Sequence, residues 1–132
     1  MSYLLDTNIV SAHIRRPSGL AHRFIQYSGR LSISSMVLAE LYAWAHRRGN
    51  PAPLIGSIQA LLPALRTLNF DATCAERYGE LRPILARRGV TVDPADLVIA
   101  STALVHGLTL VTHNTADFRA IPGLRLEDWL IP

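Results

Sequence analysis

The sequence contains no lysine and only one cysteine, and both scarcities exclude classes of mechanism. Without lysine the chain has no Schiff-base or P-loop chemistry, because each needs a lysine side chain. Cys74 has no partner, so it forms neither an internal disulfide nor a structural zinc site, and a reducing, cytoplasmic location is expected.

Charge is also scarce: 17% of the 132 residues are charged and 49% are hydrophobic, which excludes disorder and predicts a single domain with one core. No run approaches the roughly 18 apolar residues of a membrane span, and an acid at position 6 argues against a signal peptide. The net charge of +3 is a mild bias toward anionic partners.

Several nucleotide-binding and hydrolase signatures are missing. The chain has no G-x-G-x-x-G, no G-x-x-x-x-G-K-[ST] and no G-x-S-x-G. The pair Leu5-Asp6 is compatible with a haloacid-dehalogenase-type phosphatase, but Asn8 stands where that chemistry needs a second aspartate.

Apolar residues alternate between the strand and helix periods along the chain. Strands are predicted at residues 3–5, 31–34, 67–70, 108–112 and 124–127. Helices are predicted at residues 7–14, 18–28, 36–48, 54–65, 72–88 and 93–106, with a helical turn at 115–119. Pro63 and Pro83 argue against the continuity of two of these helices. Strands separated by helices indicate an α/β sandwich with a mainly parallel sheet.

Two acids occupy positions where charge is awkward. Asp6 ends the first strand, where ligands of parallel sheets bind, although it could equally cap the following helix. Glu40 has only apolar neighbours at helical spacing, and it lies too deep to cap its helix. Because a lone buried carboxylate is unfavourable, a functional role is favoured for Glu40.

Two further acids lie near helix starts. Asp96 is the third residue of a helix capped by Asp93, where an acid suits the helix dipole, yet that helix is apolar on nearly every side. Asp117 is the third residue of a short helix that Asn114 would cap. Four carboxylates beside core elements repel one another unless cations bind, and oxygen ligands select Mg²⁺ or Mn²⁺. Such ions support phosphodiester hydrolysis.

Four segments together resemble the PIN domain, and most closely its VapC-type ribonuclease toxins. They begin with Leu5-Asp6-Thr7-Asn8 and Val37-Leu38-Ala39-Glu40-Leu41. Asp96-Leu97-Val98-Ile99-Ala100 and Asn114-Thr115-Ala116-Asp117-Phe118 follow in the same order, and the resemblance spans residues 3–129. It implies a PIN-like α/β/α sandwich and a bacterial toxin–antitoxin pair.

The resemblance also implies an endoribonuclease that uses Mg²⁺ or Mn²⁺ to activate a water for in-line attack on RNA. Its metal-binding and catalytic acids map onto Asp6, Glu40, Asp96 and Asp117. Its polar pocket positions map onto Thr7, Asn8, Thr112 and Asn114. Transfer RNA is the favoured substrate by analogy. The implied partners are a small VapB-type antitoxin and a second copy of the chain, in a heterotetramer or a larger assembly.

Three arginine pairs each close a predicted helix: Arg15-Arg16, Arg47-Arg48 and Arg87-Arg88. Favourable placement at the negative end of the helix dipole accounts for them, and contacts to RNA phosphates are the alternative. Two other functions stay open: a PIN-like module that binds RNA or a partner without cutting, and a structure-specific DNA nuclease.

Overall fold

The computed structural model describes residues 1–131 and contains a five-stranded sheet in the order β3-β2-β1-β4-β5. Every neighbouring pair of strands is parallel. The strands are β1 (Tyr3–Leu5), β2 (Leu31–Ser34), β3 (Arg66–Leu68), β4 (Thr109–Val111) and β5 (Leu126–Glu127). The helices are α1 (Thr7–Arg15), α2 (Pro17–Gln26), α3 (Ser35–His46), α4 (Ala52–Leu61), α5 (Ala72–Arg87), α6 (Pro94–Val105) and α7 (Thr115–Phe118).

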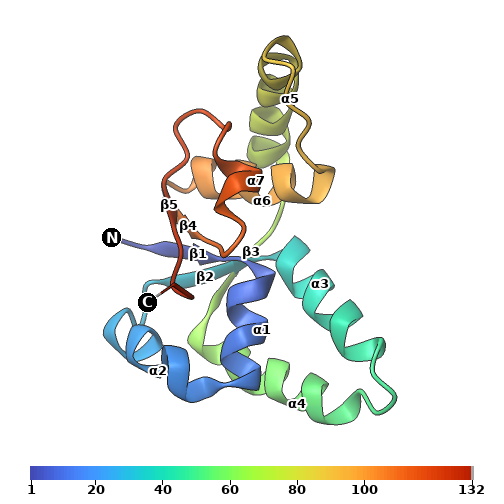
Figure 1. Cartoon of the computed structure of the whole chain (residues 1–132), viewed down its shortest axis with the longest axis vertical. Helices are drawn as coiled ribbons and strands as arrows, with labels where there is room; N and C mark the ends of the chain where they lie inside the picture. Colours follow the sequence, from blue (N-terminus) through green and yellow to red (C-terminus); the bar gives the residue numbers. More distant parts are fainter. Residues whose placement is uncertain (132) are drawn as a thin grey trace.

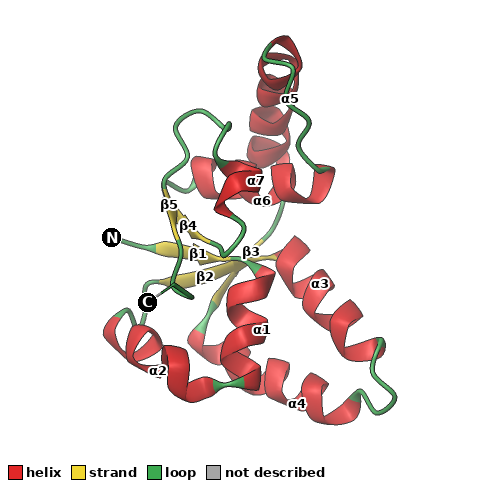
Figure 2. Cartoon of the chain, viewed as in Figure 1, coloured by secondary structure: helices red, strands yellow, loops and turns green. Residues whose placement is uncertain are grey.

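Helices cover both faces of this sheet, as the predicted α/β/α sandwich requires. Helices α1, α2 and α4 lie on one side, and α5, α6 and α7 lie on the other (Figures 1 and 2). Helix α3 packs against α1, α4 and α6, so it stands beside the sheet and contacts elements of both layers. No helix within residues 1–131 has the length and apolarity needed to cross a bilayer.

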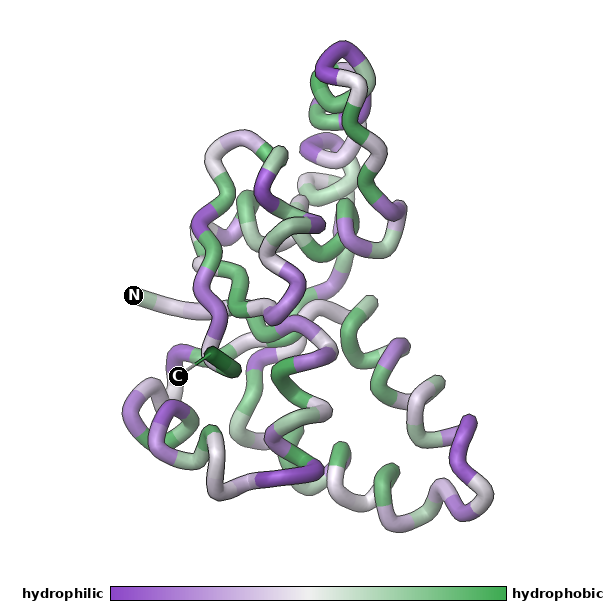
Figure 3. Tube along the Cα trace, viewed as in Figure 1, coloured by the Kyte–Doolittle hydropathy of each residue, from purple (hydrophilic) through white to green (hydrophobic). Residues whose placement is uncertain are grey.

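The central strands carry the core. Leu4, Leu5, Ile33 and Leu110 have no exposed surface, in keeping with a parallel sheet that is covered on both faces. The hydropathy of the chain follows this arrangement, with hydrophobic positions gathered around the strands and a hydrophilic stretch between α3 and α4 (Figure 3). Burial of the strands therefore fixes the sheet and directs polar residues to its two edges.

The predicted element boundaries agree with the structure to within a few residues, and the two prolines have opposite effects. The predicted helix at 54–65 ends at Leu61 and continues as a 3₁₀ turn over Leu62–Ala64, which contains Pro63. By contrast, α5 runs through Pro83 without a break. Gly107 follows α6 with a φ of 65°, a left-handed conformation that glycine adopts without strain.

The chain order places a crevice between β1 and β4. From β1 the chain moves outward to β2 and β3, and it then returns to the other side of β1 to form β4 and β5. Such a reversal of strand order leaves a crevice beyond the carboxyl ends of the two central strands, where ligands of open α/β sheets bind.

Candidate active site

Asp6 and Thr112 are the residues that directly follow β1 and β4, and the sheet register brings them together. Leu5 pairs with Val111, so the next residue of each strand leaves the sheet at the same edge. The Thr112 hydroxyl donates a hydrogen bond of 2.7 Å to Asp6 Oδ2. Asp6 Oδ1 accepts a second hydrogen bond, of 2.8 Å, from the backbone N–H of Thr7. Asp6 therefore caps α1 and faces the crevice at the same time.

The Asp6 carboxylate is buried, with an exposed fraction of 6%, and no salt bridge to it forms within residues 1–131. Burial raises its pKa above the ordinary aspartate value, the hydrogen bonds from Thr112 and Thr7 lower the pKa, and the charge of Asp117 raises it again. The net direction is upward, so the ionised carboxylate lacks charge compensation.

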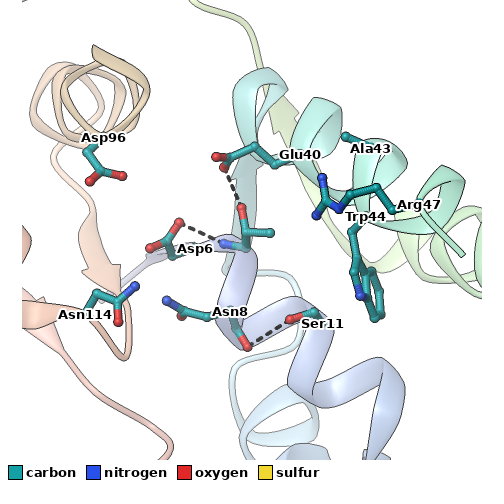
Figure 4. Close-up of a pocket in the computed structure, with 10 residues that line it drawn as sticks. Asp6, Asn8, Ser11, Glu40, Ala43, Trp44, Arg47, Asp96 and Asn114 are labelled. Carbon is teal, nitrogen blue, oxygen red and sulfur yellow. Dashed lines mark hydrogen bonds between the residues drawn. The ribbon is translucent and has the colours of Figure 1, made fainter. Parts of the chain in front are cut away.

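Glu40 reaches the same crevice from α3. The Thr7 hydroxyl donates a hydrogen bond of 2.6 Å to Glu40 Oε1, which joins the start of α1 to the middle of α3 (Figure 4). Helix α3 itself begins where Ser34 ends β2 and accepts a hydrogen bond from the backbone N–H of Val37. Glu40 is thus held one and a half turns into a helix whose start is fixed to the sheet.

Asp96 enters the crevice from α6, on the other layer of the sandwich. It is the third residue of α6, and Asp93 caps that helix by accepting a hydrogen bond from the Ala95 N–H, as the sequence predicts. Burial is the largest cause that raises the pKa of Asp96 to about 6, followed by the charges of Asp6, Asp93, Asp117 and Glu40. Carboxylates from separate elements therefore act on one another across the crevice.

These acids line a pocket of about 400 Å³ between α1, α3 and α6 (Figure 4). The lining consists of Asp6, Thr7, Asn8, Ser11, Glu40, Ala43, Trp44, Arg47, Asp96 and Asn114. Three of the four predicted acids thus share one cavity. The pocket combines an acidic floor with a wall on α3 that contains an aromatic ring and a guanidinium.

The fourth acid, Asp117, is exposed and does not line the pocket, although its charge raises the pKa of both Asp6 and Asp96. The prediction that Asn114 caps α7 through its side chain is wrong, because this side chain makes no capping hydrogen bond. Asn114 lines the pocket instead. Its backbone N–H donates to the Thr112 hydroxyl at 3.1 Å, and this contact sets the turn that points the Asn114 side chain into the crevice.

Asn8 and Thr112 support the site from below. Asn8 accepts a hydrogen bond of 3.1 Å from the backbone N–H of His113, and its amide donates to the Thr112 hydroxyl at 3.5 Å. Thr112 is fully buried and lies under the pocket rather than in its lining. The two side chains fasten the loop after β4 to α1.

Of the six paired arginines, only Arg47 lines this pocket. Arg15 and Arg16 line a different cavity beside α2, and the Arg88 guanidinium donates a hydrogen bond to the Ala120 carbonyl at 3.2 Å. The remaining two, Arg48 and Arg87, are exposed at helix ends. Sequence reasoning did not predict Ser11, Ala43 or Trp44 in the pocket, but the helical spacing of residues 40, 43, 44 and 47 was a usable signal.

Within residues 1–131, no three or more His, Cys, Asp or Glu side chains are positioned to enclose a metal ion. The chemistry of the donors nevertheless fits a hard cation. The candidate ligands are carboxylate oxygens, and crowding raises the pKa of both Asp6 and Asp96, which a bound cation would offset.

A parallel α/β/α sandwich with a carboxylate pocket at its topological switch point defines the class of this protein. The family model described as PIN domain matches residues 3–124, and the chain belongs to that family. The resemblance predicted from the sequence is therefore confirmed.

Its relatives include proteins named VapC. The chain is 37% identical to the tRNA(fMet)-specific endonuclease VapC of Shigella flexneri, over 98% of each chain. DNA-bound VapBC from Salmonella typhimurium has a similar structure, with a TM-score of 0.92, 35% identity and 98% coverage of each chain. VapBC2 from Rickettsia felis, bound to a promoter DNA fragment, gives a TM-score of 0.91 at 35% identity and covers 98% and 99%.

Proposed function

We propose that this protein is a metal-dependent endoribonuclease of the VapC toxin type, which hydrolyses phosphodiester bonds in RNA. The observation that carries the proposal is the meeting of Asp6, Glu40 and Asp96 in one pocket at the switch point of a PIN domain. The relatives named ribonuclease or endonuclease support the same reaction.

Asp6 and Asp96 are the proposed main ligands of Mg²⁺ or Mn²⁺, because both are crowded carboxylates without a cationic partner. When bound, such an ion would activate a water and offset the charge on the leaving oxygen. Glu40, positioned by the Thr7 hydroxyl, either joins the ligands or orients the water. Asp117 adds negative potential from outside the pocket and is the fourth candidate ligand.

Transfer RNA is the proposed substrate class, since the Shigella flexneri relative is named for tRNA(fMet). A VapB-type antitoxin is the proposed partner, together with a second copy of this chain. Two relatives were solved as VapBC complexes. In addition, several large apolar side chains of α3 and α4 are only half-buried, and a partner would cover them: Leu38, Tyr42, Leu54 and Ile55.

Incubation of the purified protein with total RNA, in Mg²⁺ and in EDTA, tests the function. We expect new RNA ends in Mg²⁺ only, concentrated in transfer RNA when the ends are mapped. Uncut RNA that still binds the protein would favour the non-catalytic module. Cleavage of structured DNA in preference to RNA would favour the DNA nuclease.

A further inference from the structure

The α3 wall of the pocket is built from one helical face that begins at Glu40. Ala43 and Trp44 follow Glu40 by one turn, and Arg47 follows by two, so all four residues project from the same side of α3. Figure 4 shows the indole and the guanidinium beside the cavity, with Glu40 at its far end. The wall thus continues directly from the acidic floor.

The two tryptophans of the chain differ in their surroundings. Trp129 is buried, stacks on Tyr27 with ring centroids 5.6 Å apart, and donates its indole N–H to Glu127 at 3.1 Å. Trp44 is half-buried and lines the pocket, and within residues 1–131 no other aromatic ring packs against it. Packing in the core accounts for Trp129, whereas it does not account for the face that Trp44 presents to the cavity.

The cations beside Trp44 are also left available. The Arg48 guanidinium lies 5.8 Å from the centre of the Trp44 ring, and Arg47 makes no salt bridge to Glu40 within the described chain. An aromatic face next to an arginine is the arrangement by which proteins hold single-stranded nucleic acid, with the ring stacked on a base and the cation on a phosphate.

We propose that Trp44 and Arg47 hold one unpaired nucleotide of the RNA beside the acidic floor, with Trp44 stacked on its base and Arg47 on the adjacent phosphate. This inference rests on the proposed function and adds a requirement to it, because a base in a duplex cannot present its face to Trp44. The enzyme then selects single-stranded or splayed-out nucleotides at the cleavage site.

Binding of a labelled RNA oligonucleotide tests this proposal in an Asp96→Asn background, which slows cleavage during the measurement. We expect Trp44→Leu to weaken binding of an unpaired RNA about tenfold, and Trp44→Phe, which keeps an aromatic face, to bind nearly as well as the parent. Binding of a duplex of the same sequence should be equal in all three proteins. The contrast between Leu and Phe separates stacking from a general loss of apolar contact.

Intrinsic fluorescence gives an independent readout. Unpaired RNA should quench the tryptophan emission of the parent protein, and this quenching should disappear in Trp44→Phe, in which only the buried Trp129 still emits. Equal affinities of the Leu and Phe variants, or quenching that persists in Trp44→Phe, would overturn the proposal. So would a Trp44→Leu protein that binds RNA normally but no longer binds its antitoxin. If the wild type cuts RNA and these tests fail, only the Trp44 inference is lost.

Discussion

The two edges of the sheet are built from the same strands but carry opposite charge. The carboxyl edge holds the pocket lined by Asp6, Glu40 and Asp96. The amino edge holds a pocket of about 280 Å³, whose charged lining consists of Arg30 and Arg66, with His106 beside them. The strand interiors are apolar in both directions, so the residues that flank each strand decide what each edge can bind. A parallel sheet makes this division possible because all of its strands begin at one edge and end at the other.

Removal of one carboxylate from the acidic edge should have the largest effect. We expect Asp6→Asn and Asp96→Asn each to reduce the rate of RNA cleavage by about 100-fold or more, since each removes a candidate ligand and a charge from the pocket. Asp71→Asn is the matched control, because Asp71 caps α5 outside this pocket and asparagine can still accept the hydrogen bond from Cys74. Wild-type rates in either pocket variant, measured on the same RNA in Mg²⁺, would refute the assignment.

The two ends of β4 offer a matched pair of threonines. Thr112 donates to Asp6, whereas the buried hydroxyl of Thr109, at the opposite end, has no hydrogen-bond partner within residues 1–131. We expect Thr112→Val to lower the free energy of unfolding by about 1–3 kcal/mol, because it leaves the buried Asp6 carboxylate with one acceptor unpaired. Thr109→Val should be neutral or stabilising.

Urea unfolding of the two threonine variants measures this difference directly. Thr112→Val should also move the pH profile of cleavage upward, because the lost hydrogen bond is one that lowers the pKa of Asp6. Equal destabilisation by the two substitutions would mean that the edges do not differ in the way described.

The pKa of Asp96 predicts how the acidic edge depends on pH. Its pKa in the folded chain is about 6, above the ordinary value of 3.8, so folding favours the neutral acid. That stabilisation is complete below about pH 4 and is lost as the pH rises through 6. In EDTA, Asp96→Asn should therefore raise Tm by about 3 °C at pH 7.5 and change it little at pH 4.5.

Asp71 should behave in the opposite way. The hydrogen bond from the Cys74 N–H lowers its pKa, so ionised Asp71 stabilises the fold above the ordinary pKa and this contribution is lost in acid. Asp71→Asn should lower Tm at pH 7.5, and Mg²⁺ should raise the Tm of the wild type at that pH but have less effect on Asp96→Asn. A thermal scan followed by circular dichroism separates the two aspartates. Identical behaviour of both variants would contradict the assigned causes.

Much of this molecule follows from local rules. The apolar runs at residues 3–5 and 109–111 predict buried parallel strands, and Asp93 followed by Pro94 predicts the start of α6. The convergence of Asp6, Glu40 and Asp96 also follows, because parallel strands end at one edge. Asp6 shows that the two interpretations of an acid after a strand do not compete, since it caps α1 and lines the pocket.

What the sequence could not predict depends on loop geometry and on which face of a helix is used. The side chain of Asn114 turns into the pocket because Thr112 holds its backbone, a contact that no local pattern encodes. The pair Arg47-Arg48 suits a helix end equally well at both positions, yet only Arg47 lies on the helical face of Glu40. Packing of α3 against α1 and α6 decides that difference.

A salt titration of RNA binding compares the cations of the two edges. Arg47 lines the acidic pocket and Arg66 lines the opposite one, and both side chains are exposed. If Arg47 contacts a phosphate, Arg47→Gln should reduce the slope of log K against log salt concentration by about 0.7, the value for one contact to a single strand. Arg66→Gln should leave the slope unchanged, because RNA seated at the acidic edge does not reach the amino edge. Equal slopes for both variants would show that the basic edge also binds RNA, and the functional division between the two edges would then be wrong.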